Sequence, residues 1–142
     1  MKIDFFSTTL NSSILKKLSK LFKKKFISSG SESDQFEKKF SKLFSLKYCT
    51  AVNSGTSALH LSLRCGKIGF GDEVIIPAQT FIATGLAVKY VGAKPVFADI
   101  QKNTGNICPK SILKKISKKT KAIIVVHWGG YPCDMFEIKK IA

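Results

Sequence analysis

The pattern of hydrophobic and polar positions changes its period near residue 47. Before that point apolar residues recur at helical spacing with lysines between them, which predicts amphipathic helices over residues 12–28 and 34–46. Beyond it, short apolar runs alternate with helical patterns. The predicted strands cover residues 48–52, 73–77, 95–100 and 121–126, and the predicted helices cover residues 54–65, 80–91, 110–117 and 136–142.

Strands and helices in strict turn are typical of β-α-β units. We therefore predict an α/β fold with a mostly parallel sheet and helices on both of its faces. A polar break over residues 28–33, in which Gly30 suits a helix C-cap, precedes this region. The predicted organisation is an N-terminal helical arm over residues 1–33 and a main domain over residues 34–142.

The two ends of the chain are informative about compartment and length. No run approaches the roughly 18 apolar residues of a membrane span, and the first residues lack the apolar core of a secretory signal. Both observations favour the cytoplasm. The last helix keeps apolar positions at Met135, Ile138 and Ile141 without a stop signal, which predicts that the chain is the truncated front part of a longer protein.

The formal net charge of +15 allows a nucleic-acid or acidic-membrane partner. Of the 24 basic residues, however, only Arg64 is an arginine, and specific readers of nucleic acids usually exploit the planar arginine fork. We favour solvated lysines, with neither nucleic acid nor membrane as a partner. A non-catalytic basic module, binding nucleic acid or anionic lipid through the cluster at residues 23–25, stays open as an alternative.

The four cysteines show no C-x-x-C pair and no metal-ligand spacing. Cys65 falls late in an apolar helical pattern and Cys49 lies beside a β-like run, so both are predicted to be buried thiols. We expect no metal site and a reducing compartment.

Candidate chemistry begins at the sequence Ser54-Gly-Thr-Ser57, where a predicted strand hands over to a helix. The first amides of a helix lack intrahelical partners, and the helix dipole makes that end partly positive. Gly55 lets the backbone approach a ligand closely, and the hydroxyls of Thr56 and Ser57 add hydrogen bonds. A phosphate is the natural occupant. An ordinary serine N-cap explains the same residues equally well.

The next junction between a strand and a helix places Phe81 in its turn. Ligands of parallel α/β folds gather at the carboxyl ends of the strands, where an exposed aromatic ring would stack on a flat cofactor; the alternative is that Phe81 belongs to the core. A phosphate cradle and an aromatic platform on neighbouring loops suit pyridoxal phosphate. His127 and Asp99 also follow strands, and for both we favour structural roles, Asp99 in a turn or cap.

Four segments in this order and spacing resemble the DegT/DnrJ/StrS family of sugar aminotransferases: NSGTSALHLSL, GFGDEVIIPAQTFIATGLAV, GAKPVFADI and KTKAIIVVHWGGYPCDM. The resemblance implies an incomplete large domain of a fold-type I pyridoxal-phosphate (PLP) transferase. It implies transfer of an amino group from glutamate to a nucleotide-linked ketosugar, as in polysaccharide biosynthesis, by a homodimer. By motif, Gly55, Thr56 and Ser57 would hold the cofactor phosphate and Phe81 would stack on the pyridine ring.

PLP enzymes also need a lysine for the Schiff base and an acid facing the ring nitrogen. In the family that the chain resembles, both follow the segments present here, so we expect the Schiff-base lysine after Ala142 and no catalytic residue within the chain. The 142 residues alone are thus expected not to transaminate. Some members carry histidine at the lysine position and are PLP-dependent sugar dehydratases, and this alternative stays open, as does a naturally truncated, non-catalytic product.

Overall fold

The computed structural model describes residues 8, 10–24 and 30–142, and the remainder of the predicted helix over 12–28 lies outside them. The chain divides into two compact units, Met1–Ala51 and Val52–Ala142. Each unit is described by itself below.

The first unit contains two helices, α1 (Ser12–Phe22) and α2 (Ser31–Leu43). Asn11 caps α1, because its side-chain oxygen accepts a hydrogen bond from the N–H of Ile14 at 3.3 Å. Helix α2 begins earlier than predicted, with acidic residues in its first turn, where the helix dipole favours them. Neither helix has a buried residue. The aromatic rings of Phe36 and Phe40 in α2 and of its C-cap residue Phe44 lie next to one another at helical spacing.

The predicted strand over residues 48–52 is wrong. These residues have neither strand nor helix structure. Their β-like composition supplies propensity only, whereas a strand needs a neighbouring strand to bond its backbone, and the described residues offer none at this place. The N–H of Ala51 instead donates to Oε1 of Glu37 at 2.7 Å.

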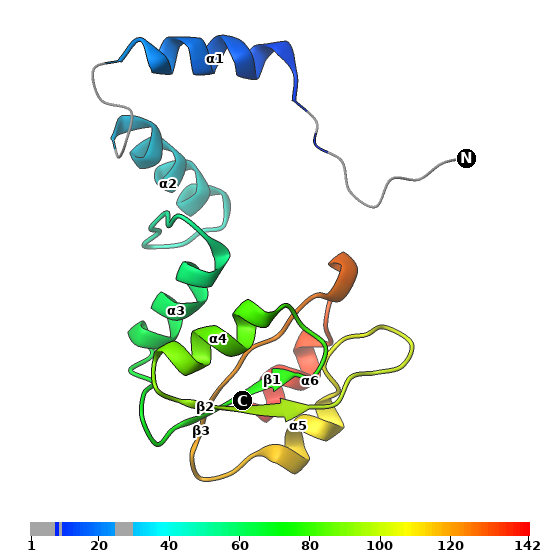
Figure 1. The fold of residues 1–142 in the computed structure, drawn as a ribbon. Helices are drawn as coiled ribbons and strands as arrows, with labels where there is room; N and C mark the ends of the chain where they lie inside the picture. Colours follow the sequence, from blue (N-terminus) through cyan, green and yellow to red (C-terminus); the bar gives the residue numbers. More distant parts are fainter. Residues whose placement is uncertain (1–7, 9, 25–29) are drawn as a thin grey trace. The chain divides into compact units, whose positions relative to one another are not determined.

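The second unit is built on three parallel strands in the order β2-β1-β3 (Figure 1). Strand β1 is central, and its Ile75 pairs with Val96 of β2 and Ile123 of β3. The predicted α/β fold with a parallel sheet is confirmed. The elements are α3 (Gly55–Cys65), β1 (Glu73–Pro77), α4 (Ile82–Tyr90), β2 (Lys94–Ala98), α5 (Pro109–Lys115), β3 (Thr120–Ile123), the 3-10 turn η1 (Trp128–Gly130) and α6 (Met135–Ile141).

Two hydrophobic clusters cover the two faces of the sheet, because successive side chains of a strand point to opposite sides. Val74 and Ile76 of β1 belong to the cluster that includes buried residues of α3 and α4, and Ile75 belongs to the cluster with buried residues of α5 and α6. Figure 1 shows α4 and α5 on opposite sides of the strands. The predicted helices on both faces are thereby confirmed.

The prediction that Cys65 and Cys49 are buried is wrong, because Cys65 is exposed and Cys49 is only partly covered. Leu59 and Leu63 lie on the side of α3 that faces the core. Cys65 lies two positions beyond Leu63, about 200° around a helix of 3.6 residues per turn, and therefore faces away from the core.

A carboxylate ties together the amino ends of the strands. Oε2 of Glu73 accepts a hydrogen bond from the Ser117 hydroxyl at 2.7 Å, and Nζ of Lys94 lies 3.6 Å from Oε1. The Ser117 hydrogen bond, aided by the charge of Lys94, lowers the pKa of Glu73 below its ordinary value of 4.5. Stabilisation from this lowered pKa is therefore present above pH 4.5 and is lost as the pH falls through the folded-state pKa of Glu73.

Replacing Ser117 by alanine should therefore destabilise the chain more at neutral pH than in acid. The measurement is urea unfolding of the wild type and of Ser117→Ala at several pH values between 3 and 7, a range on the order of two pH units to either side of the ordinary carboxyl pKa. In a Glu73→Gln background, which has no carboxyl to titrate, the same substitution should have an effect independent of pH. If the effect of Ser117→Ala were independent of pH in the chain that retains Glu73 as well, the hydrogen bond would not be the cause of the lowered pKa of Glu73.

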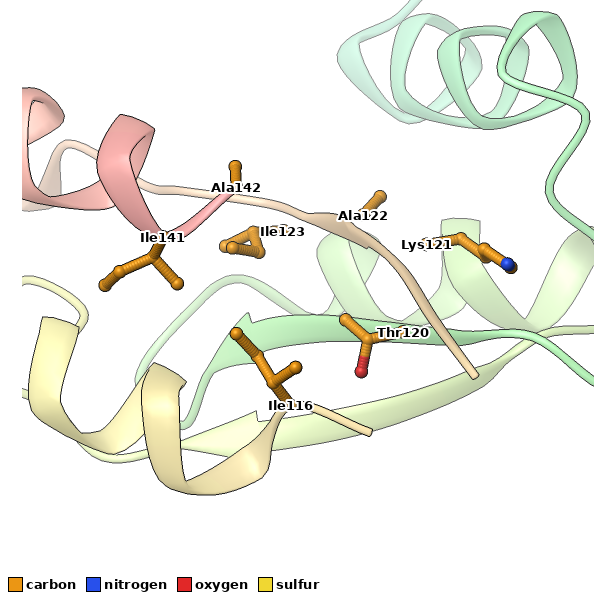
Figure 2. Close-up of a pocket in the computed structure, with 7 residues that line it drawn as sticks. All are labelled: Ile116, Thr120, Lys121, Ala122, Ile123, Ile141 and Ala142. Carbon is orange, nitrogen blue, oxygen red and sulfur yellow. The ribbon is translucent and has the colours of Figure 1, made fainter. Parts of the chain in front are cut away.

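Strand β3 is bordered on its open side by a small apolar cavity of about 190 Å³. Figure 2 shows three isoleucines around it, Ile116 after α5, Ile123 on β3 and Ile141 on α6, while the amine of Lys121 extends away from them. The cavity adjoins the open side of the strand, so it is separate from the carboxyl edge, where ligands of parallel sheets gather.

Candidate functional site

The N-terminus of α3 is fixed by a short network of hydroxyls. Ser54 is the N-cap, and its Oγ accepts a hydrogen bond from the N–H of Ser57 at 3.1 Å. The Ser57 hydroxyl donates to Oδ1 of Asn53 at 2.7 Å and lies 2.9 Å from the Ser54 hydroxyl. The N-cap expected as the ordinary explanation of this sequence is therefore real, and it occupies one of the first amides.

The cap leaves two amides of the first turn available. The N–H groups of Gly55 and Thr56 have no acceptor among the described residues, as expected for the start of a helix. A Cβ built at Gly55 would meet nothing within 4 Å, so the approach to these amides is open. The Ser57 hydroxyl already donates to Asn53, so Thr56 offers the more accessible hydroxyl donor of the two.

Phe81 lies beyond the carboxyl end of β1 and is the N-cap residue of α4. Its side chain is 75% exposed, so the alternative that it belongs to the core is wrong. The turn beneath it is ordered, because the N–H of Ala78 donates to the carbonyl of Ala98 at 2.9 Å and the hydroxyls of Thr80 and Thr84 lie 2.7 Å apart. Helices α3 and α4 pack against each other, so Phe81 and Gly55–Ser57 stand at the starts of two adjacent helices.

A loop over residues 127–133 follows β3 at the same edge of the sheet. The N–H of Cys133 donates to Nδ1 of His127 at 3.0 Å, and the Cys133 thiol donates to the carbonyl of Val126 at 3.2 Å. Burial raises the pKa of Cys133, which keeps this thiol protonated and able to donate. Gly129 and Gly130 adopt positive φ values of 59° and 84° and allow the tight path.

Asn106, which the sequence did not single out, anchors this loop from the segment between β2 and α5. Its side chain is buried and makes three hydrogen bonds: Nδ2 donates to the carbonyls of Tyr131 and Pro132, each at 3.0 Å, and Oδ1 accepts from the N–H of Trp128 at 2.9 Å. At Gly105, where φ is +71°, a Cβ would lie 2.6 Å from Cδ1 of Trp128, so only glycine fits beneath that ring. The sequence Gly105-Asn106 carried a turn signal and no sign of its distant partners.

Residues 8–142 match the sequence profile of the DegT/DnrJ/EryC1/StrS aminotransferase family. The chain belongs to this family. The family predicted from the four sequence segments is thus confirmed.

Two curated relatives in the DegT/DnrJ/EryC1/StrS family show how much of a member is present. The chain is 49% identical over 113 residues to dTDP-3-amino-3,6-dideoxy-alpha-D-galactopyranose transaminase of Aneurinibacillus thermoaerophilus, a match that covers 80% of this chain and 31% of the relative. It is 45% identical over 115 residues to GDP-perosamine synthase of Escherichia coli O157:H7, covering 81% of this chain and 32% of the relative. The chain thus spans about a third of the length of these relatives.

Among solved structures, the PLP-form of the sugar aminotransferase Spr1654 of Streptococcus pneumoniae superposes with a TM-score of 0.92 at 30% identity. The match covers 99% of this chain and 36% of that structure. The predicted fold type, part of the large domain of a fold-type I PLP enzyme, is confirmed by such neighbours.

Asp99, another residue that follows a strand, is hydrogen-bonded to neighbouring residues of the chain. It directly follows β2. Its N–H donates to the Ser111 hydroxyl at 2.9 Å, and its carbonyl accepts from the N–H of Cys108. Within residues 8, 10–24 and 30–142, no group of three or more His, Cys, Asp or Glu side chains is placed to hold a metal ion. In the same described stretches, no helix is both long and apolar enough to cross a membrane.

The geometry defines what this part of the family site can do. Two open amides at a helix start, with a hydroxyl beside them, suit the oxygens of a phosphate. An exposed aromatic ring at the carboxyl edge of the sheet suits a flat heterocycle. The residues present therefore fit the two chemical parts of PLP, a phosphate and a pyridine ring.

Proposed function

We propose that the chain is the N-terminal part of a PLP-dependent aminotransferase that moves an amino group from glutamate to a nucleotide-linked ketosugar. The names of its relatives, a dTDP-aminosugar transaminase and a GDP-perosamine synthase, support a nucleotide-sugar substrate. The proposal rests on two features of helices that pack against each other: unoccupied amides at the start of α3 and an exposed Phe81 at the start of α4.

In this proposal each residue has a separate task. The amides of Gly55 and Thr56 and the Thr56 hydroxyl bind the cofactor phosphate, and the N–H of Ser57 keeps its cap bond to the Ser54 hydroxyl. A bound phosphate, an acceptor only, would draw the Ser57 hydroxyl proton away from Asn53. Phe81 stacks on the pyridine ring and so fixes its plane.

The cofactor, when bound, supplies an electron sink for the amino-transfer chemistry. The lysine that would hold it covalently lies beyond Ala142 in this proposal, so the 142 residues bind the cofactor without transaminating. The residue at that position, read from the coding sequence, separates an aminotransferase with lysine from a dehydratase with histidine. Residues 1–33 would serve as an arm, residues 34–142 as the front of the large domain, and the complete protein would act as a cytoplasmic homodimer.

Binding of pyridoxamine 5'-phosphate (PMP) and of inorganic phosphate to the isotope-labelled 142-residue chain tests the assignment by NMR. Both probes should shift the amide signals of Gly55, Thr56 and Ser57, because both carry a phosphate. Only PMP should shift the ring signals of Phe81. The loss of ring stacking in Phe81→Ala should weaken PMP by roughly two- to tenfold and leave inorganic phosphate unchanged.

Gly55→Ala tests the phosphate-binding part of the site, as Phe81→Ala tests the ring-stacking part. A methyl group at this position meets no protein atom within 4 Å, so the fold should persist, but the methyl would occupy the space through which a phosphate approaches the amides. Affinity for both probes should fall. Shifts spread over the lysine-rich helices α1 and α5, with no change at Gly55, would contradict the cofactor site and favour a general basic surface instead.

A further inference from the structure

The imidazole of His127 is held in one tautomer by the backbone of its own loop. The N–H of Cys133 donates to Nδ1 at 3.0 Å, so Nδ1 carries a lone pair and the single ring proton of the neutral imidazole resides on Nε2. Cys133 is held in place, because it is buried and its thiol donates a hydrogen bond to the carbonyl of Val126. The ring is therefore both oriented and limited to one tautomer.

The opposite side of the ring is free to act. His127 is an exposed residue, and Nε2 has no hydrogen-bond partner within the described part of the chain. An asparagine would cap the Cys133 amide just as well through its oxygen, so the loop does not need an imidazole for its closure. What histidine adds is the outward Nε2–H donor.

The position of this donor relates it to the candidate site. Strands β1 and β3 are parallel neighbours, with Ile75 paired to Ile123, so the residues that follow them emerge at the same edge of the sheet. Phe81 follows β1 and His127 follows β3. Asn106 holds the loop over residues 127–133, which contains His127, by its bonds to Trp128, Tyr131 and Pro132. The backbone that carries the donor is therefore fixed in place.

We propose that His127 is a ligand-binding residue, a neutral imidazole that donates its Nε2–H to an anionic oxygen of a molecule bound at this edge. The inference rests on the proposed function, which supplies two sources of such an oxygen. One is the cofactor, with its phosphate and ring hydroxyl, and the other is the diphosphate of the nucleotide sugar. Both accept one hydrogen bond from a neutral donor without a change of charge on the protein.

Two isosteric variants separate the two sides of the ring. In His127→Asn the amide oxygen takes the place of Nδ1 and keeps the bond from Cys133, but nothing replaces Nε2–H. In His127→Gln the amide nitrogen reaches the place of Nε2, but the acceptor for Cys133 is lost. We expect His127→Asn to keep the thermal midpoint of the wild type and to lose affinity for the ligand. His127→Gln should lower the midpoint.

The experiment combines ring ¹⁵N spectra of His127 in the 142-residue chain with titrations of PMP and of dTDP. The spectra should show protonated Nε2 and unprotonated Nδ1. For the probe that supplies the oxygen, His127→Asn should raise the dissociation constant about two- to tenfold, the loss expected for one neutral hydrogen bond. A loss confined to PMP assigns the cofactor as the source, and a loss confined to dTDP assigns the nucleotide.

Failure of this inference is distinguishable from failure of the proposed function. If PMP shifts the amides of Gly55–Ser57 but His127→Asn binds both probes as tightly as the wild type, the ligand role of His127 is overturned and the cofactor site stands. A ring proton on Nδ1 would overturn the inference as well. If the wild type binds neither probe, the proposed function and the role of His127 both fall.

Discussion

Asn106→Asp is expected to lower the free energy of unfolding of the chain by about 3–5 kcal/mol, the cost of leaving a buried charge uncompensated. The side chain is 2% exposed, and its Nδ2 donates to two carbonyl oxygens. An aspartate has the same shape but presents an oxygen to those carbonyls, so two hydrogen bonds become two repulsive contacts. The carboxylate would also be buried away from water.

Asn103→Asp is the matched control, because it introduces the same charge into the same connection between β2 and α5 at an exposed position. It should change the free energy of unfolding by no more than about 0.5 kcal/mol. Urea unfolding at pH 7 measures both variants. A loss below about 1 kcal/mol for Asn106→Asp, smaller than one net hydrogen bond, would show that Asn106 does not anchor the loop over residues 127–133.

Asn106 also shows where sequence reasoning ends. Its three backbone partners lie 22 to 26 positions further along the chain, and no local pattern announces a bond of that length. The Gly105-Asn106 pair signals a turn, and a turn is what a local pattern can predict. The close contact between Gly105 and Trp128 is hidden for the same reason, since it depends on the path of another loop.

Elements whose cause is local were predictable. Strand β1 has the predicted bounds, Glu73–Pro77, because a continuous apolar run between turn residues is typical of a buried parallel strand. The start of α3 follows from a serine N-cap, and the place of Phe81 follows from the junction between a strand and a helix. The candidate residues Gly55, Thr56, Ser57 and Phe81 could therefore be located before the fold was known, although their binding roles remain predictions.

Elements that need a distant partner were not predictable. Residues 48–52 have the composition of a strand, yet the described chain provides no strand to pair with them. The exposure of Cys65 required the phase of α3 relative to the core, which Leu59 and Leu63 determine. In both cases the residue types were read correctly, and the missing information was which surface lies opposite them.

A second large loss of stability is expected when a buried side chain is removed from either face of β1. Ile76→Ala and Ile75→Ala should each lower the free energy of unfolding by about 2–5 kcal/mol, the range for removing a fully buried aliphatic side chain. Both residues are 0% exposed, but Ile76 packs in the cluster with α3 and α4, whereas Ile75 packs in the cluster with α5 and α6. Similar losses are expected because both faces are covered.

Ile82→Ala tests whether this loss comes from burial, because Ile82 is 68% exposed on α4 and should lose less than about 1 kcal/mol. The relative losses of Ile75→Ala and Ile76→Ala test whether both faces of the sheet are equally well packed. The partly buried Ile123 and Ile141 pack against the Ile75 cluster and also line the cavity beside β3, so this face has the looser boundary. If Ile75→Ala cost less than about 1 kcal/mol while Ile76→Ala kept its full effect, the layer formed by α5 and α6 would not be packed on the sheet. The loop over residues 127–133, which joins β3 to α6, would then lose its base, and His127 could not be held as a directed donor.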